Sequence, residues 1–392
     1  MKIWKTLKRL GIPYIMLLAC CYTLTSSTNI YILICLCVIM VPYHFIQTQL
    51  WDKNSGILLL WGISYFIITT IYYTPNSWAN EIGYLLGPVT FYLCGKLFTH
   101  RLQNQGAVIL MIATVCACSS ITIFTMTFND IAKGELIAYS RRFDVQDAVL
   151  AATLYGLVAA ITLSGLGFFI AARKNTSKYL NIVFLVLFAG SILTTIHLIN
   201  RTGIIIALVC TISIMAVQGA RRAGRMIVLL AIVSIITIAY FGTDWLAQSV
   251  EAYSYRNESG LGLESGGGRF ERWVDAIEKL FNYPFGWWLN HSTYNAQVHN
   301  LWLDIARVAG LIPFTLIVIF TVRVISKQYK ILKKYKDQPI AILTFGIILS
   351  MLLASAVEPV IEAKICYMCL LIFFAGIESQ MYEDRHALLK DK

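Results

Sequence analysis

Long apolar runs alternate with short polar connections along most of the chain. A helix needs about 20 mostly apolar residues to cross the hydrocarbon core of a bilayer. The pattern predicts an all-α fold, a polytopic integral membrane bundle in which residues 1–392 form a single integral membrane domain. Twelve membrane-spanning helices are expected, at 10–26, 29–46, 56–73, 81–98, 106–127, 148–172, 180–199, 202–217, 227–241, 301–324, 339–357 and 364–377.

Two of the polar connections are long enough to have structure of their own. The smaller covers residues 128–147 and the larger covers 242–300. Within the larger loop, apolar residues at helical spacing predict an amphipathic helix near 269–282, which would lie on the outer membrane face or cap the bundle. Its predicted apolar face consists of Phe270, Trp273, Ile277 and Phe281.

Charge gives the orientation of the predicted spans. Only 14% of residues are charged and 58% are hydrophobic, whereas soluble domains carry about 25% charged residues. Most of the 32 Lys and Arg residues fall in alternate connections, and such connections face the cytoplasm. Both termini are therefore expected in the cytoplasm and both long loops outside. The net charge of +11 is dispersed over short loops, so no nucleic-acid partner is expected.

Several arginines lie on the predicted outer side, where the charge rule does not place them. Arg201 stands in HLINRTGII at a tight turn between two apolar spans, Arg269 follows three glycines, and Arg141 and Arg142 precede another span. An Arg beside hydrocarbon needs an anionic or carbonyl partner. Its planar fork suits phosphate oxygens. These residues are candidates for a phosphate site, although SGGGR by itself also fits a flexible loop.

A histidine stands where the larger loop meets the next apolar run. His299 and Asn300 open the sequence HNLWLDIARVAG, which also carries Asp304 and Arg307. Histidine is suited to general-base chemistry near neutral pH. The alternative is an interfacial histidine hydrogen-bonded to a loop carbonyl. Asp304 and Arg307 have the spacing of an ion pair within one helix, and Asn300 is expected to cap that helix or to satisfy the pair.

Together, outward arginines and one histidine favour group transfer from a phosphate-activated lipid in the outer leaflet. No acidic cluster with metal-ligand spacing lies in the outward segments, and the chain has no P-loop. We therefore expect no metal, no nucleotide and no other cofactor. The donor has to arrive already activated.

Three ordered motifs resemble the bacterial O-antigen ligase and O-antigen polymerase superfamily. HNLWLDIARVAGLIPF is similar to its histidine motif, and LINRTGIIIAL to its short motif with an Arg at an outward helix turn. GGGRFERWVDAIEKLFNYPFGWW resembles the segment in which Gly-x-Arg precedes a helix and an Asn-Pro-x-x-Gly sequence, whose place Asn282-Tyr283-Pro284-Phe285-Gly286 takes here. Asn200 departs from the pattern, because a hydroxyl residue usually precedes the Arg.

The resemblance implies a function and a location. Members transfer glycans from undecaprenyl diphosphate on the periplasmic side of the bacterial inner membrane, without metal or nucleotide. His299 would be the base, Arg201 and Arg269 would hold the diphosphate with help from Arg141 or Arg142, and Asn300 and Asp304 would support them. The implied partners are the undecaprenyl-diphosphate-linked glycan, membrane lipids and an acceptor, either the lipid A-core or a lipid-linked repeat.

Several functions remain open. A ligase, which the Arg turn and loop layout resemble slightly more, attaches the finished glycan to lipid A-core. A polymerase of O-antigen, capsule or exopolysaccharide joins lipid-linked repeats, and protein O-glycosyltransferases form a third option. A transporter of lipid-linked oligosaccharides is the alternative from another class. It would show internal repeats and titratable groups at mid-depth, which the sequence lacks apart from His44, His197 and Glu362, each near a span end.

Overall fold

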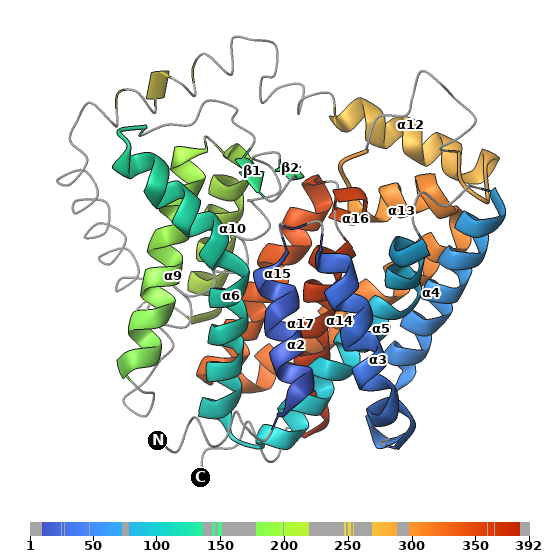
Figure 1. Ribbon diagram of the computed structural model, residues 1–392, viewed down its shortest axis with the longest axis horizontal. Coiled ribbons are helices and arrows are strands. Elements are labelled where there is room, and N and C mark those ends of the chain that lie inside the picture. Colours follow the sequence, from blue (N-terminus) through green and yellow to red (C-terminus); the bar gives the residue numbers. More distant parts are fainter. Residues whose placement is uncertain are drawn as a thin grey trace. The chain divides into compact units, whose positions relative to one another are not determined.

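Helices make up nearly all of the chain that the structure describes (Figure 1). The computed structural model describes residues 10–24, 26, 28–46, 48–72, 78–135, 143–145, 148–150, 178–198, 200–218, 269–287, 298–358, 360–363 and 365–384, with single positions at 247, 250, 251 and 254. Two three-residue strands, β1 (Phe143–Val145) and β2 (Ala148–Leu150), pair antiparallel.

The chain groups into two compact units. Unit 1 comprises Met1–Val115, Glu271–Ile331 and Ser355–Lys392, and unit 2 comprises Cys116–Phe270 and Leu332–Ala354. Unit 1 contains α2 (Ile12–Tyr22), α3 (Asn29–Ile46), η1 (Thr48–Leu50), α4 (Lys53–Tyr72), α5 (Trp78–Leu102), the start of α6 (Gln105–Ala132), most of α12 (Arg269–Asn282), α13 (Leu301–Ala309), most of α14 (Leu311–Tyr335), α16 (Val360–Ala363) and α17 (Ile365–Glu383). Unit 2 contains the rest of α6, the two strands, α9 (Lys178–His197), α10 (Arg201–Gln218) and most of α15 (Pro339–Val357).

Six of the described helices are long and apolar enough to cross a membrane: α4, α6, α9, α14, α15 and α17. The helices α2, α3 and α10 are apolar but shorter. The predicted spans 148–172 and 227–241 lie outside the described residues, except that 148–150 form β2. The helical membrane class follows from the six helices, whereas the count of twelve spans and the single integral domain stay predictions.

Glycines let the helices of unit 1 pack with their backbones in contact. A Cβ added to Gly95 of α5 would lie 2.2 Å from the carbonyl oxygen of Phe373 in α17, and one added to Gly376 would lie 2.2 Å from that of Tyr92. A Cβ on Gly62 of α4 would lie 2.3 Å from the carbonyl oxygen of Leu85. Small residues at such crossings are the usual means of close helix packing in membranes. The helix α5 therefore packs closely against both α4 and α17.

The predicted span 301–324 is wrong in one respect, because the structure divides it into α13 and α14. The break is at Gly310, which adopts φ +77° and donates its backbone N–H to the carbonyl oxygen of Ala306. With ψ −161° this backbone leaves helical geometry, and glycine adopts such a conformation without strain. The nine-residue α13 is too short to cross a bilayer and forms a separate element before the long helix α14.

The amphipathic helix predicted near 269–282 is confirmed as α12. Its predicted apolar face, however, divides into two parts. Trp273 packs with the buried Ala276 and Leu280 into a cluster that includes Val298 and Leu303 of the following segment. Phe270, Ile277 and Phe281 are instead exposed. The helix therefore contacts the rest of unit 1 through a different set of residues from the one that periodicity alone predicts.

Candidate functional site

His299 occupies a turn that the carboxylate of Asp304 holds from both sides. Its φ is +57°, a left-handed conformation that non-glycine residues adopt uncommonly. Asp304 Oδ1 accepts a hydrogen bond from Val298 N at 2.8 Å, and Oδ2 accepts one from Asn300 N at 3.2 Å. Residues kept in such conformations cluster at functional sites. The carboxylate fixes the backbone on each side of the half-buried histidine.

Two further polar side chains complete this turn. Asn300 is the N-cap of α13, because its Oδ1 accepts from Leu303 N at 3.2 Å, and its Nδ2 donates to the carbonyl oxygen of Ala356 at 3.1 Å. The Nε1–H of Trp273 in α12 donates to the carbonyl oxygen of Val298 at 3.0 Å. The capping role predicted for Asn300 is confirmed. The histidine turn is thus tied to α12, to α13 and to the end of α15.

Asp304 and Arg307 form the predicted ion pair within one helix. Arg307 Nε lies 3.8 Å from Asp304 Oδ1, and both side chains are buried. Burial raises the pKa of the Asp304 carboxyl, while the N–H groups of Val298 and Asn300 and the charge of Arg307 oppose that shift. Arg307 therefore helps to keep Asp304 in the ionised form, which accepts both backbone hydrogen bonds beside His299.

We predict that Asp304→Asn lowers activity about 100-fold, the usual effect of displacing a reacting group by about 1 Å. An amide has one accepting oxygen and one donating nitrogen, so it cannot accept from Val298 N and Asn300 N through two separate atoms as the carboxylate does. The measurement is the rate of the glycan transfer that the motif resemblance implies, at equal amounts of membrane protein. Asp275→Asn, which changes a half-exposed carboxylate of α12, is the matched control and should stay within about threefold of wild type. Equal rates for the two variants would contradict a positioning role for Asp304.

The Asn282–Gly286 segment docks against the junction of α13 and α14. Leu311 N donates to the carbonyl oxygen of Pro284 at 2.8 Å, and Trp287 N donates to that of Arg307 at 2.9 Å. Gly286 has φ +94°, and a Cβ there would lie 2.7 Å from the carbonyl oxygen of Val308. Two motifs that are separate in the sequence therefore meet in the structure through backbone contacts that require glycine.

The structure describes the four candidate arginines only in part. Arg201 is the first residue of α10 and Arg269 the first of α12. The side chain of Arg201, and Arg141 and Arg142 as a whole, lie outside the described residues. Arg201 and Arg269 are assigned to unit 2 and His299 to unit 1, so their convergence stays a prediction. Both helix N-termini carry the positive end of the helix dipole beside a guanidinium group, which favours an anion.

The turn that presents Arg201 is stabilised by polar side chains within unit 2. Asn200 Oδ1 accepts a hydrogen bond from Gly203 N at 3.1 Å and so caps α10. Asn is as good an N-cap as Ser, so the departure at position 200 keeps a capping side chain. One turn earlier, His197 Nε2 lies 3.4 Å from Asp130 Oδ2. This pair is a polar feature beside the turn between α9 and α10 that sequence reasoning missed.

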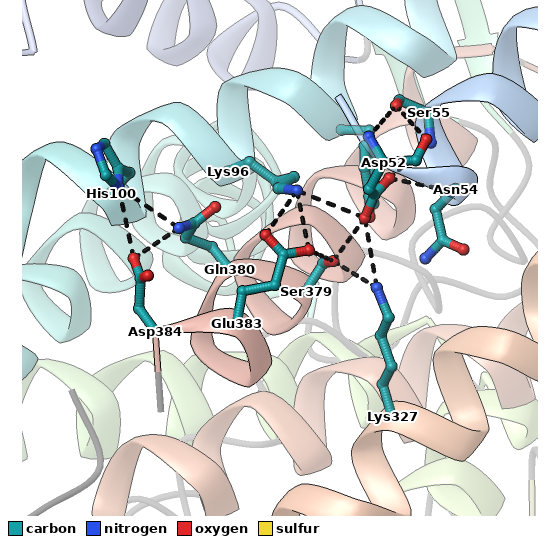
Figure 2. A network of polar contacts seen from close by, with 11 residues as sticks. Asp52, Asn54, Ser55, Lys96, His100, Lys327, Ser379, Gln380, Glu383 and Asp384 are labelled. Carbon is teal, nitrogen blue, oxygen red and sulfur yellow. Dashed lines mark hydrogen bonds and ion pairs between the residues drawn. The ribbon is translucent and has the colours of Figure 1, made fainter. Parts of the chain in front are cut away.

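Unit 1 contains a larger polar network, at the opposite end of the unit from the His299 turn, which was not predicted (Figure 2). The buried Lys96 of α5 lies 2.9 Å from Glu383 Oε2 and 3.5 Å from Asp52 Oδ2. Lys327 of α14 lies 3.4 Å from Asp52 Oδ2 and donates to Ser379 Oγ at 2.5 Å. The network joins the start of α4 to α5, α14 and α17. The network lies at the start of α4, and α12 lies near the end of that helix. Because α4 has 20 residues, the two ends are about 30 Å apart.

Asp52 is the central residue of this network. Its Oδ1 accepts from Asn54 N and Ser55 N, each at 2.9 Å, and so caps α4, while Tyr92 Oη donates to Oδ2 at 2.7 Å. Burial opposes ionisation of this carboxyl, but Lys96, the Ser55 N–H, Tyr92 and Lys327 outweigh it and hold its pKa well below the usual range. Asp52 therefore contributes stability above about pH 4, and this contribution is lost as pH falls through its lowered pKa.

We predict that Lys96→Met lowers the free energy of unfolding by about 2 kcal/mol. Removing one partner of a buried ion pair costs more than this, but Asp52 and Glu383 are partly exposed and can be hydrated. Thermal unfolding in detergent is the measurement. Lys333→Met, at an exposed position near the end of α14, is the control and should change stability by less than about 0.5 kcal/mol. Equal melting temperatures for the two variants would show that the network contributes nothing.

Comparison with known proteins gives no further guidance. A scan against protein-family models and a search of curated proteins found no match to this sequence. Among the residues that the structure describes, no group of three or more His, Cys, Asp and Glu side chains is placed to hold a metal ion. The prediction of transfer without a metal stays a prediction.

Proposed function

We propose that this protein transfers a glycan from an undecaprenyl-diphosphate-linked donor to an acceptor hydroxyl at the outer surface of the bacterial inner membrane. The observation that carries the proposal is the turn of His299, which the Asp304 carboxylate holds in a left-handed conformation through Val298 N and Asn300 N. A histidine whose backbone is fixed at the start of a short helix is a candidate general base. The motif resemblance supplies the donor class.

The proposed reaction needs one proton transfer and one displacement. A ring nitrogen of His299 takes the proton from the acceptor hydroxyl, and the hydroxyl oxygen forms a bond to the anomeric carbon of the donor glycan. The bond from that carbon to the diphosphate oxygen breaks, and its electron pair leaves with undecaprenyl diphosphate. Because the diphosphate is a good leaving group, the reaction needs cations to neutralise it more than it needs a general acid.

Arg201 and Arg269 are proposed to supply those cations. Each is the first residue of a helix, α10 or α12. Backbone N–H groups and the helix dipole at such positions add to the charge of the guanidinium group. Arg141 and Arg142 are proposed to assist them. Both substrates are confined to the membrane, which raises their effective concentration at the site.

The acceptor separates two versions of the proposal. We favour a ligase, whose acceptor is the lipid A-core of lipopolysaccharide, because the Arg turn and the position of the large loop resemble ligases slightly more. A polymerase of O-antigen, capsule or exopolysaccharide uses the same base and the same diphosphate site with a lipid-linked repeat as acceptor. The proposed location is the inner membrane, with both termini in the cytoplasm and the site on the periplasmic side.

The experiment is a lipopolysaccharide gel of a strain that lacks this gene, with and without a plasmid copy. A ligase predicts core without O-units in the deletion strain, with long glycan remaining on undecaprenyl diphosphate. A polymerase predicts core that bears a single O-unit and no ladder. Restoration by the plasmid assigns the defect to this chain. An unchanged ladder would contradict a role in O-antigen transfer.

One observation favours transport of a lipid-linked oligosaccharide as a second candidate. Glu378, five residues before the end of α17, is fully buried, as is Lys96 in α5. Ionisable side chains inside membrane helices often mark a transport pathway. If the protein is a transporter, its loss traps the lipid-linked glycan on the cytoplasmic side. If it is a transferase, the glycan accumulates on the periplasmic side, where an externally added glycosidase reaches it.

A further inference from the structure

The helix α12 carries an apolar stripe of four side chains, each more than half exposed. Phe270, Val274, Ile277 and Phe281 are 59%, 58%, 53% and 74% exposed. Their spacing of four, three and four residues places them on one side of the helix. A contiguous exposed apolar stripe on a helix is typical of an interaction surface.

The surface of α12 divides into three sectors around the helix axis. Ala276 and Leu280 face the cluster that holds Val298. The exposed stripe follows next around the helix. The third sector is polar and carries Glu271, Asp275, Glu278 and Lys279, with an ion pair of 2.7 Å between Lys279 Nζ and Asp275 Oδ2. A helix with one packed, one apolar and one charged side fits a boundary between hydrocarbon and water beside the protein.

The stripe continues onto a surface that would face lipid. Phe285, three residues after α12, stacks on Tyr72 at the end of α4 with ring centroids 5.6 Å apart. The helix α4 is long and apolar enough to cross a bilayer. Its exposed apolar side chains, Leu60, Ile63, Ile67 and Ile71, form one line along it. A membrane-spanning helix exposes such a line to acyl chains, and the contact between Tyr72 and Phe285 extends this surface to α12.

Aromatic residues at the same end of unit 1 mark the level of the membrane surface. Tyr72 ends α4 and is 49% exposed, and Trp78 begins α5 and is 59% exposed. Exposed Tyr and Trp residues are concentrated where membrane helices leave the hydrocarbon. Figure 1 shows α12 at this end of α4, running across the direction of that helix. This is the orientation of a helix that lies in the plane of the interface.

We propose that α12 inserts its stripe of Phe270, Val274, Ile277 and Phe281 into the interfacial region of the bilayer, beside the outer end of α4. The partner is therefore the boundary between lipid headgroups and acyl chains. Trp273 of the same helix donates to the carbonyl oxygen of Val298, so the inserted helix also sets the height of His299 above the hydrocarbon. The inference depends on the membrane location of the chain and not on the reaction proposed for it.

The test is photo-crosslinking in vesicles of phosphatidylethanolamine and phosphatidylglycerol. The photoreactive residue p-benzoyl-phenylalanine replaces Ile277 or Phe281 in separate full-length proteins, and Glu278 in the matched control. Ile277 and Glu278 are neighbours and both exposed, but they belong to the apolar and the polar sector. The expected result is a lipid adduct, seen by mass spectrometry, at Ile277 and at Phe281 in many times the yield at Glu278.

Three outcomes would overturn the inference. A crosslinked dimer from Ile277 or Phe281 would mean that a second copy covers the stripe, and a crosslink within one chain would mean that another segment covers it. Equal lipid yields at Ile277, Phe281 and Glu278 would mean that the helix is not oriented at the interface. Gel filtration of each variant in detergent verifies folding, and because all three positions are exposed, none of the substitutions disturbs the packed face.

Discussion

Replacing His299 by Ala is expected to lower glycan transfer about 1,000-fold or more, because general acid–base catalysis contributes about 100-fold to 10,000-fold in enzymes. The variant should still accumulate in the membrane, because the two hydrogen bonds that Asp304 accepts come from the backbone N–H groups of Val298 and Asn300 and do not involve the imidazole. The deletion strain that carries this variant should show the lipopolysaccharide pattern of the deletion itself. The measurement is the intensity of the restored ladder at equal protein levels.

His100→Ala is the control for this variant. His100 lies at the opposite end of unit 1, where its Nδ1 is 3.4 Å from Asp384 Oδ2 and its side chain is 37% exposed. Its replacement should leave transfer near the wild-type level. Full activity of His299→Ala would exclude His299 as the base. Loss of activity in both variants would point to a general effect of the substitutions on folding.

Replacing Gly310 by Ala is expected to lower the free energy of unfolding by about 2 to 6 kcal/mol, the sum of backbone strain at a conformation that suits only glycine and an overpacked contact. Gly310 has φ +77°, and a Cβ there would lie 2.0 Å from the carbonyl oxygen of Pro284. Relief of this contact would separate the Asn282–Gly286 segment from α14 and break the hydrogen bond from Leu311 N to Pro284. Protein yield in the membrane and thermal unfolding in detergent are the measurements.

Gly56→Ala is the matched control, because a Cβ at Gly56 meets nothing within 4 Å. This substitution in the first turn of α4 should change stability by less than about 1 kcal/mol. A Gly310→Ala protein as stable as Gly56→Ala would mean that the two motifs do not dock as the structure has them.

Several features were predictable because they depend on residues close together in the sequence. The spacing of apolar residues gave α12 its bounds, and the polar pair Asn200-Arg201 located the turn between α9 and α10. The pairing of Asp304 with Arg307 and the capping by Asn300 are also local. Helical periodicity and capping rules apply over about four residues, so one sequence is enough to detect them.

Other features depend on contacts between distant residues and were missed. The network of Asp52, Lys96, Lys327 and Glu383 joins four segments of the chain, and each residue alone is typical of a charged span end. The break at Gly310 depends on the docking of Pro284. An apolar run with a single glycine is equally consistent with one continuous helix. The same limit applies to α12, whose apolar side chains divide between packed and exposed sectors only once its neighbours are in place.

Glycan transfer by His299 can be measured with the purified protein. The protein would be mixed in detergent with an undecaprenyl-diphosphate-linked glycan and lipid A-core acceptor, and both the glycosylated acceptor and the released undecaprenyl diphosphate would be measured over time. If the protein is the proposed transferase, the two products appear in equal amounts with the wild-type protein, and both are lost together in His299→Ala. Absence of both products with a folded wild-type protein, when supplied with either lipid A-core or a lipid-linked repeat, would contradict the proposed function.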